Sequence, residues 1–157
     1  MGARIIDVIE DSIGAEVGIE PGDTLLSING LPVMDILDYQ FYSQDDQLIL
    51  EIEKPNGELW SIDIEKDYDE ELGLLFEGVV FDRIRVCRNL CVFCFIDQLP
   101  PAMRKTLYVK DDDYRYSFMF GNFVTLTNLT EDDWSKLERM RLSPLYVSVH
   151  TTSGELR

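Results

Sequence analysis

The stretch Val86-Cys87-Arg88-Asn89-Leu90-Cys91-Val92-Phe93-Cys94-Phe95 holds all three cysteines of the chain. Three thiols this close cannot form a complete set of disulfides, because one is always left over. The spacing C-x-x-x-C-x-x-C lets one short loop turn three sulfur atoms toward a single inorganic centre, and thiolates favour zinc or iron–sulfur clusters. This segment, the cysteine loop (residues 87–94), therefore carries the strongest hypothesis about function.

The cysteine loop lacks an obvious fourth ligand. A structural zinc site wants four protein ligands, and an ordinary electron-transfer [4Fe–4S] cluster wants four cysteines. The chain has one histidine, His150, far downstream of Cys94, and no second C-x-x-C pair. Three ligands favour an iron–sulfur cube whose open iron binds a substrate or cofactor. A zinc site completed by His150 or a carboxylate, and an electron-transfer cluster, stay open as alternatives.

The sequence around the cysteine loop predicts alternating strands and helices. Strands are predicted over residues 79–86, 123–127 and 145–149, and helices over residues 94–99, 102–107 and from Thr130 onward. The order strand, helix, strand, helix, strand is a βαβαβ pattern, which implies parallel strands. Because polar groups after such strands gather at one edge, we expect the cysteine loop, Thr127, Asn128 and His150 to face one cavity. The alternative for the last three is ordinary polarity at strand ends.

The cysteine spacing, with Phe93 just before the last cysteine, resembles the signature of the radical S-adenosylmethionine (SAM) superfamily. The resemblance implies that Cys87, Cys91 and Cys94 bind a [4Fe–4S] cluster and that SAM chelates its open iron. It also implies that Phe93 lies near the adenine, that Thr127, Asn128 and His150 contact the cofactor, and that a reductant such as flavodoxin or ferredoxin is needed. Many members carry Gly-Gly-Glu where this chain has Thr125-Leu126-Thr127-Asn128.

The first seventy residues predict a small β-rich domain with two helices, capped by Ser12 and Asp35. They resemble a bacterial PDZ domain through the motif Asp11-Ser12-x-x-Ala15-x-x-Gly18-Ile19-x-Pro21-Gly22-Asp23-x-Leu25-Leu26-x-Ile28-Asn29-Gly30. PDZ domains add a peptide strand to a sheet edge and hold a C-terminal carboxylate in a backbone nest. By that resemblance, a peptide or protein C-terminus would bind at Leu72-Gly73-Leu74-Leu75-Phe76. Alternatively, this segment is only the last strand of the domain, packed against its neighbour.

Nearly the whole chain resembles the N-terminal part of a bacterial family in which a PDZ domain, a radical SAM domain and a C-terminal domain of unknown function are fused. The further segments that carry this resemblance are Cys94-Phe95-Ile96-Asp97-Gln98-Leu99-Pro100, Lys110-Asp111-Asp112-Asp113-Tyr114-Arg115, Gly121-Asn122-x-x-Thr125-Leu126-Thr127-Asn128-Leu129 and Arg141-Leu142-Ser143-Pro144-Leu145-Tyr146-Val147-Ser148-Val149-His150.

The predicted fold class is therefore α/β with a small β-rich domain. A PDZ-like domain spans residues 1–77, and residues 78–157 form the βαβαβ first half of a partial TIM-like radical SAM barrel. The predicted function is that of a radical SAM enzyme of unknown substrate with a PDZ docking module. Because only three barrel strands fit after residue 78, we expect the chain to be a fragment that is inactive alone. The alternative is a non-catalytic PDZ adaptor with a structural zinc or electron-transfer site.

Composition limits the partners. The net charge is −16, from 30 acidic and 14 basic residues, which argues against nonspecific binding to nucleic acid or an anionic membrane. No apolar run approaches the length of a membrane span. Clustered free thiols indicate a reducing cytoplasm. The run Asp111-Asp112-Asp113 is predicted to be solvated acidic surface.

Overall fold

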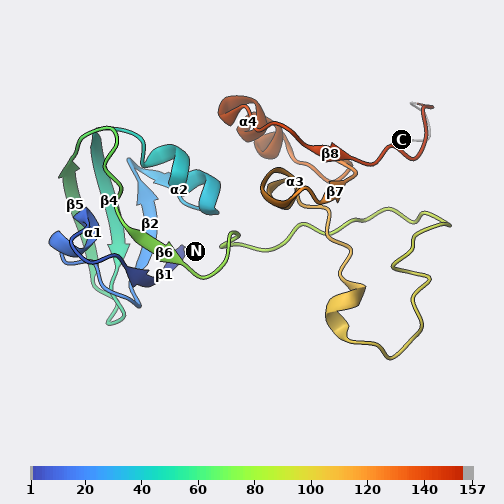
Figure 1. The fold of residues 1–157 in the computed structure, drawn as a ribbon, viewed down its shortest axis with the longest axis horizontal. Helices are drawn as coiled ribbons and strands as arrows, with labels where there is room; N and C mark the ends of the chain where they lie inside the picture. Colours follow the sequence, from blue (N-terminus) through green and yellow to red (C-terminus); the bar gives the residue numbers. More distant parts are fainter. Residues whose placement is uncertain (1, 154–157) are drawn as a thin grey trace. The chain divides into compact units, whose positions relative to one another are not determined.

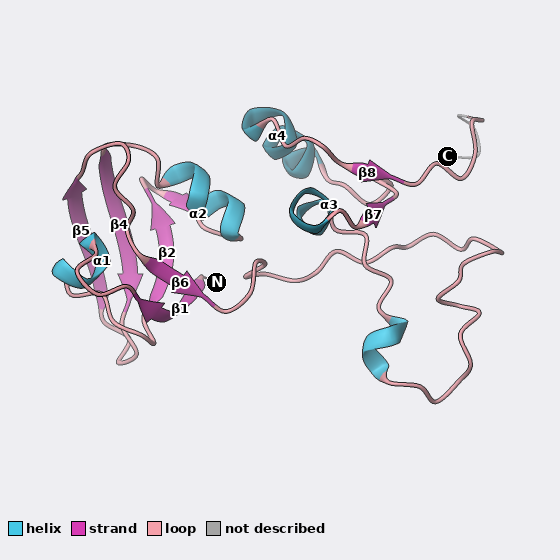
Figure 2. Cartoon of the chain, viewed as in Figure 1, coloured by secondary structure: helices cyan, strands magenta, loops and turns pink. Residues whose placement is uncertain are grey.

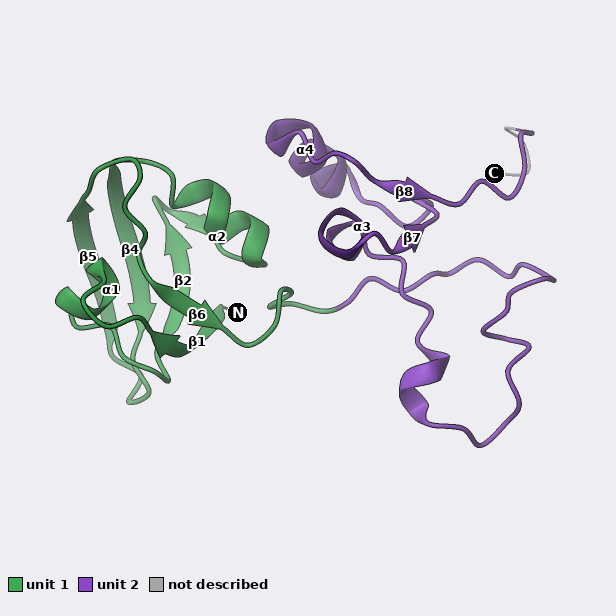
Figure 3. Ribbon diagram, viewed as in Figure 1, with its two compact units in different colours: residues 1–83 green, residues 84–157 purple. Residues whose placement is uncertain are grey.

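The computed structural model describes residues 2–153 and divides the chain into two compact units, Met1–Arg83 and Ile84–Arg157 (Figure 3). The boundary lies after residue 83 rather than after residue 77. The reason is that the backbone of Val79 and Phe81 hydrogen-bonds back to unit 1, at Ile36 and Met34. Among the described residues, none of the helices has the length and apolar character that a membrane span needs.

Unit 1 is built on an antiparallel sheet with strand order β5-β4-β2-β1-β6, and β3 pairs with β2 outside this path (Figure 1). The strand β4 shows why the sheet forms: Leu48, Leu50 and Ile52 are buried while the residues between them are exposed, as a half-buried strand requires. The strands are β1 (Ala3–Val8), β2 (Thr24–Ile28), β3 (Leu31–Pro32), β4 (Gln47–Glu53), β5 (Leu59–Glu65) and β6 (Leu74–Phe76).

The two helices of unit 1 begin where the sequence predicts. Ser12 caps α1 (Ile13–Glu16) and accepts the Ala15 N–H. Asp35 caps α2 (Ile36–Tyr42), and one of its oxygens accepts the N–H groups of Leu37 and Asp38, each at 3.0 Å. Asp35 is fully buried, so these bonds satisfy donors that the helix itself leaves open. Both predicted caps are confirmed.

The last strand of unit 1, β6, pairs antiparallel with β1 and follows a glycine in the left-handed region of the backbone. Gly73 has φ +73°, and a Cβ there would lie 2.4 Å from the Ser12 side chain. Only glycine fits this close approach of the backbone to the Ser12 side chain. Within the segment 72–76, residues 74–76 form the last strand of the sheet of unit 1.

Unit 2 contains α3 (Tyr114–Phe120), α4 (Glu131–Met140), the 3₁₀ turn η1 (Lys105–Tyr108), and the short strands β7 (Phe123–Val124) and β8 (Tyr146–Val147). The strands β7 and β8 pair in parallel, which confirms the predicted direction of these two. The helix α4 begins after Thr130, as predicted, and carries a capping box between Thr130 and Asp133.

The predicted strand over residues 79–86 is wrong. Within the described residues this segment forms only isolated bridges, Asp35 with Val80 and Val86 with Asp111. Val80 bridges to a residue of unit 1 and Val86 to a residue of unit 2, and the Val86 bridge is antiparallel. Among residues 2–153, the segment therefore has no parallel strand beside it along its length. The described part of the chain therefore has a two-stranded parallel sheet, and the βαβαβ opening of a partial TIM-like barrel is not confirmed.

The predicted helices over residues 94–99 and 102–107 are also wrong. The first is a series of turns, and the second is replaced by η1, whose preceding residue Arg104 makes no capping bond (Figure 2). In a short segment without caps, the few hydrogen bonds formed do not offset the free-energy cost of helix nucleation. In turn, α3 was not predicted, because its cap Asp113 belongs to the run expected to be solvated surface. Asp112 and Asp113 are in fact buried.

Candidate functional site

Backbone hydrogen bonds hold the start of the cysteine loop. The N–H of Cys87 donates to the Lys110 carbonyl at 2.8 Å, and the N–H of Asp112 donates to the Arg85 carbonyl at 2.9 Å. A turn closes the other end, where the Cys94 N–H donates to the Cys91 carbonyl at 3.0 Å. All three cysteines are free and half-buried, so their sulfur atoms remain available for chemistry.

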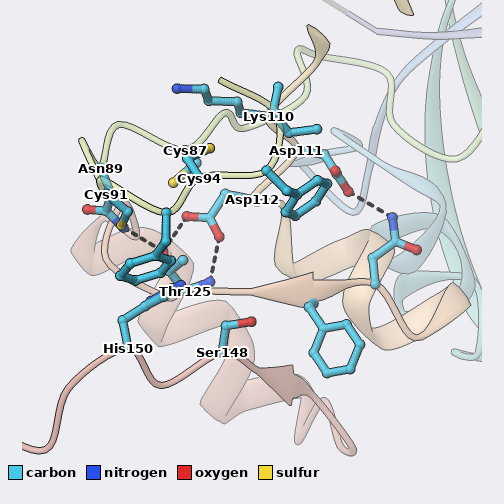
Figure 4. Close-up of a pocket in the computed structure, with 15 residues that line it drawn as sticks. Cys87, Asn89, Cys91, Cys94, Lys110, Asp111, Asp112, Thr125, Ser148 and His150 are labelled. Atoms are coloured by element: carbon cyan, nitrogen blue, oxygen red, sulfur yellow. Dashed lines mark hydrogen bonds between the residues drawn. The ribbon is translucent and has the colours of Figure 1, made fainter. Parts of the chain in front are cut away.

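One cavity of about 360 Å³ brings the predicted metal ligands together (Figure 4). Its wall contains all three cysteines and the predicted cofactor residues Phe93 and His150. The remaining lining residues are Asn89, Phe95, Ile96, Lys110, Asp111, Asp112, Asn122, Phe123, Thr125 and Ser148. The fold therefore brings the thiols and Phe93 of the cysteine loop to the same cavity as His150, which comes from a second segment of unit 2.

The donor set of this cavity fits a thiolate-bound group in its chemistry. Three thiols line it, and soft sulfur ligands select iron–sulfur clusters or zinc. Yet residues 2–153 contain no cluster of three or more His, Cys, Asp or Glu side chains arranged to hold a metal ion. The thiols thus share a cavity without being gathered into a ligating geometry.

Phe93 and His150 form a flat surface in the cavity. Their rings stack with centroids 5.3 Å apart and an angle of 30° between planes. Phe93 is 55% exposed, so much of its ring is open for a further planar group. Stacked aromatic rings are a common platform for heterocycles such as a nucleobase.

Thr127 and Asn128 differ from each other in their positions. Thr127 lines an adjacent cavity of about 430 Å³ that also contains Asn89, Cys91, Thr125 and His150. Asn128 lines neither of these two cavities; its amide donates to the carbonyls of Val86 at 3.1 Å and Asp112 at 3.3 Å. Within the described residues the buried Oδ1 of Asn128 has no partner. Asn128 therefore fastens the backbone that enters the cysteine loop.

A charged pair beside the thiols was not found from the sequence. Lys110 Nζ lies 2.6 Å from Asp97 Oδ2. The hydrogen bond between them raises the pKa of Lys110 and lowers the pKa of Asp97, which is also hydrogen-bonded by the Cys94 side chain. The two residues are 13 apart in the sequence and follow no periodic pattern, so only the fold reveals the pair.

Two ion pairs, one buried and one half-buried, frame the site, and the sequence did not predict them. Asp113 and Arg115 are almost fully buried and bonded at 2.7 Å, while Arg85 bonds to Asp133. Burial by itself would raise the pKa of Asp113, but hydrogen bonds from Arg115 and from the Arg85 N–H lower it below its usual value. Asp113 also caps α3, so one carboxylate joins that helix to the backbone of Arg85, just ahead of the cysteine loop.

In unit 1, aromatic side chains fill the space between α2 and β6. The ring of Tyr39 on α2 packs 4.8 Å from Phe76 on β6, and Phe76 packs 5.0 Å from Phe81. The Tyr39 hydroxyl is hydrogen-bonded to the backbone of Leu74, and burial raises the pKa of Tyr39 to about 12. The predicted peptide segment 72–76 is therefore covered on this side by the chain's own residues.

Comparison with known families completes this picture. The chain matches the family model of a radical SAM-like domain over residues 66–157, more than half of its length, and that of a PDZ domain over residues 4–54. The chain belongs to the radical SAM-like domain family. It carries a PDZ domain ahead of that domain, which confirms the predicted PDZ–radical SAM arrangement. No curated protein matches the chain.

Proposed function

We propose that unit 2 is part of a radical SAM enzyme in which Cys87, Cys91 and Cys94 hold a [4Fe–4S] cluster. The observation that carries the proposal is that all three free thiols line one cavity in a chain of this family. When bound, the cluster with SAM would supply one-electron chemistry, for which an electron donor such as flavodoxin or ferredoxin is needed. The substrate class is not part of the proposal.

The chain's own residues would bind and orient the cofactor. The three thiols leave one position of a four-metal cluster without a protein ligand. The Phe93–His150 stack offers a planar surface to the adenine, and the exposed face of Phe93 excludes water from it. The hydroxyl groups of Thr125, Thr127 and Ser148 line the adjoining polar space and could hydrogen-bond a ribose or an amino acid moiety.

Anaerobic reconstitution tests this proposal. We expect about four irons and four sulfides per chain, the content of one cubic cluster, and an electronic spectrum that changes when SAM is added. One zinc per chain, with no iron retained, would favour a non-catalytic adaptor with a structural metal site. An iron–sulfur cluster whose spectrum ignores SAM would favour electron transfer. Either result overturns the enzyme proposal.

A second proposal concerns unit 1, where the PDZ family match favours peptide docking. A peptide would extend the sheet along β6 and place its terminal carboxylate near the backbone of residues 72–76. Because Tyr39 is bonded to the Leu74 backbone, docking requires Tyr39 to release it. Fluorescence anisotropy with a decapeptide ending in valine, and with its C-terminal amide, tests this: only the free carboxylate should bind. Equal binding of the two peptides contradicts it.

A further inference from the structure

The buried carboxylate of Asp112 lies at the wall of the cysteine cavity and binds a single residue twice. Asp112 is 2% exposed. Its Oδ1 accepts the backbone N–H of Thr125 at 2.5 Å, and its Oδ2 accepts the Thr125 hydroxyl at 2.7 Å (Figure 4). A carboxylate can only accept hydrogen bonds, so the Thr125 hydroxyl has to donate its proton to Asp112. The lone pairs of Thr125 Oγ1 are thereby turned toward its other neighbours.

Those neighbours lead from Thr125 into the cysteine loop. Thr127 Oγ1 lies 2.8 Å from Thr125 Oγ1, and Asn89 Nδ2 donates to Thr127 Oγ1 at 2.9 Å and to Thr125 Oγ1 at 3.3 Å. Because the Thr125 hydroxyl donates to Asp112, its oxygen accepts from Asn89 Nδ2, while the Thr127 hydroxyl lies within donating distance of both Thr125 Oγ1 and Asn89 Oδ1, the latter at 3.2 Å. The carboxylate therefore orients the Thr125 hydroxyl, and the hydrogen bonds from Asp112 through Thr125 and Thr127 to Asn89 form one relay.

The position of Asn89 gives this relay its importance. Asn89 is the residue midway between Cys87 and Cys91, two residues from each. The cysteine loop carries turns rather than a helix or strand, so its own backbone does little to fix that position. A side-chain anchor at Asn89 therefore constrains both flanking thiols at once.

The backbone between the two threonines is strained in a way that suits this arrangement. Leu126 has φ +58°, in the left-handed region that a leucine rarely adopts. Such a conformation persists only where the surrounding structure holds it. Here the Thr127 N–H bonds back to Thr125 Oγ1 at 3.3 Å, so the bend keeps both hydroxyls directed at Asn89.

We propose that Thr125 is a positioning residue for the cysteine loop, which it holds through Asn89 under the direction of Asp112. The proposal rests on the proposed function for its purpose, because an ordered loop is what three thiols need to ligate one cluster. Thr125 itself need not touch the cluster. Its role is to keep Cys87 and Cys91 in one arrangement before the metal arrives.

The test compares Thr125→Val with Thr125→Ser in the full chain. Valine keeps the shape and the backbone bond to Asp112 but loses the hydroxyl, whereas serine keeps the hydroxyl. Before metal is added, the rate at which a disulfide reagent modifies each cysteine is followed by mass spectrometry. Loss of about one net hydrogen bond should raise the modification rates of Cys87 and Cys91 in Thr125→Val about fivefold, with a smaller change at Cys94. Thr125→Ser should react like the wild type.

A second variant and a second readout keep the two proposals apart. Asn89→Ala should show the same cysteine modification rates as Thr125→Val. Agreement between two different substitutions means that the conclusion does not depend on how well either variant folds. After anaerobic reconstitution, Thr125→Val should retain less than about half of the wild-type iron, because the loop is less ordered. Three outcomes would overturn the positioning role. The first is that Thr125→Val and Asn89→Ala both show wild-type modification rates, and the second is that all three cysteines react faster to the same extent in both variants. The third is that Thr125→Ser shows the same rates as Thr125→Val. A wild-type chain that binds no iron would instead defeat the proposed function, while the thiol rates still decide the role of Thr125.

Discussion

The two units of this chain are stabilised in different ways. Unit 1 has a sheet whose alternating residues bury an apolar core, with Leu25, Ile28 and Leu50 fully inaccessible. Unit 2 has two-residue strands, and its largest fully buried side chain is the cation Arg115, bonded to a buried acid. An apolar core tolerates small adjustments, whereas a buried ion pair fails when either partner is removed. The cysteine cavity, whose residues need precise placement, is thus held by ion pairs and buried hydrogen bonds, which we call the polar frame.

The largest effect is expected at the cysteines. Replacing Cys87, Cys91 or Cys94 singly with serine should abolish iron retention almost completely, because two thiolates cannot hold a cubic cluster at the open loop. Iron and sulfide assays after anaerobic reconstitution and desalting measure this. Ser61→Ala, on the exposed side of β5, is the control and should retain wild-type iron. Full iron content in any one of the three cysteine variants would contradict the assigned ligands.

The second-largest effect is expected in the free energy of unfolding of unit 2, with no change in that of unit 1. Asp113→Asn removes the negative charge of the buried Asp113–Arg115 ion pair, which should destabilise unit 2 by about 3–5 kcal/mol. Urea unfolding can be followed in each unit separately, because Trp134 lies in unit 2 and Trp60 in unit 1. Trp60→Phe leaves Trp134 as the reporter of unit 2, and Trp134→Phe leaves Trp60 as the reporter of unit 1. The unfolding of unit 1 should not change.

Asp132→Asn, an exposed acid in the first turn of α4, is the control for this substitution and should have little effect. The pH dependence gives a further check. The pKa of Asp113 is lowered in the folded chain, so its stabilisation is present above about pH 4 and lost as the pH falls below that value. Equal destabilisation of both units by Asp113→Asn would show that they are not independent.

This difference also explains how much the sequence could predict. The caps Ser12 and Asp35 are local signals, and both were predicted from the residues. The prediction that the cysteines, Phe93 and His150 share one site came from a recognised spacing and an expected strand order.

The polar frame could not be predicted in the same way. The pair of Arg85 with Asp133 joins residues 48 apart, and the relay from Asp112 to Asn89 crosses three segments. A run of three aspartates has the composition of solvated surface, and nothing local says that Asp112 and Asp113 are buried. Long-range partners override local composition at Asp112 and Asp113, which is why this run was wrongly predicted to be solvated surface.

A smaller effect is expected in unit 1 at high pH. Burial raises the pKa of Tyr39 to about 12, from 10.0 in an unfolded chain. The folded state therefore holds this proton more tightly, so stability is unaffected below pH 10 and falls between pH 10 and pH 12. The total loss should be about 2–3 kcal/mol, since one pKa unit corresponds to about 1.4 kcal/mol. Urea unfolding followed at Trp60 across this range measures it. Tyr39→Phe should remove this component, and an identical pH dependence in both proteins would contradict the burial of Tyr39.

The smallest effect concerns the covered face of β6. Tyr39→Phe keeps the ring against Phe76 but deletes the hydroxyl that is bonded to the Leu74 backbone. A peptide carboxylate would then no longer compete with the Tyr39 hydroxyl for the Leu74 backbone. The valine-ending decapeptide should therefore bind about three- to tenfold more tightly, the equivalent of one net hydrogen bond. Phe41→Ala, an exposed aromatic on the same helix, is the control and should bind like the wild type. Anisotropy titrations measure both. If Tyr39→Phe and the wild type bind alike, the hydroxyl does not guard the groove. The packing of Phe76 and Phe81 would then limit peptide docking. The affinity of unit 1 for a peptide would in that case depend on apolar packing rather than on a single polar contact.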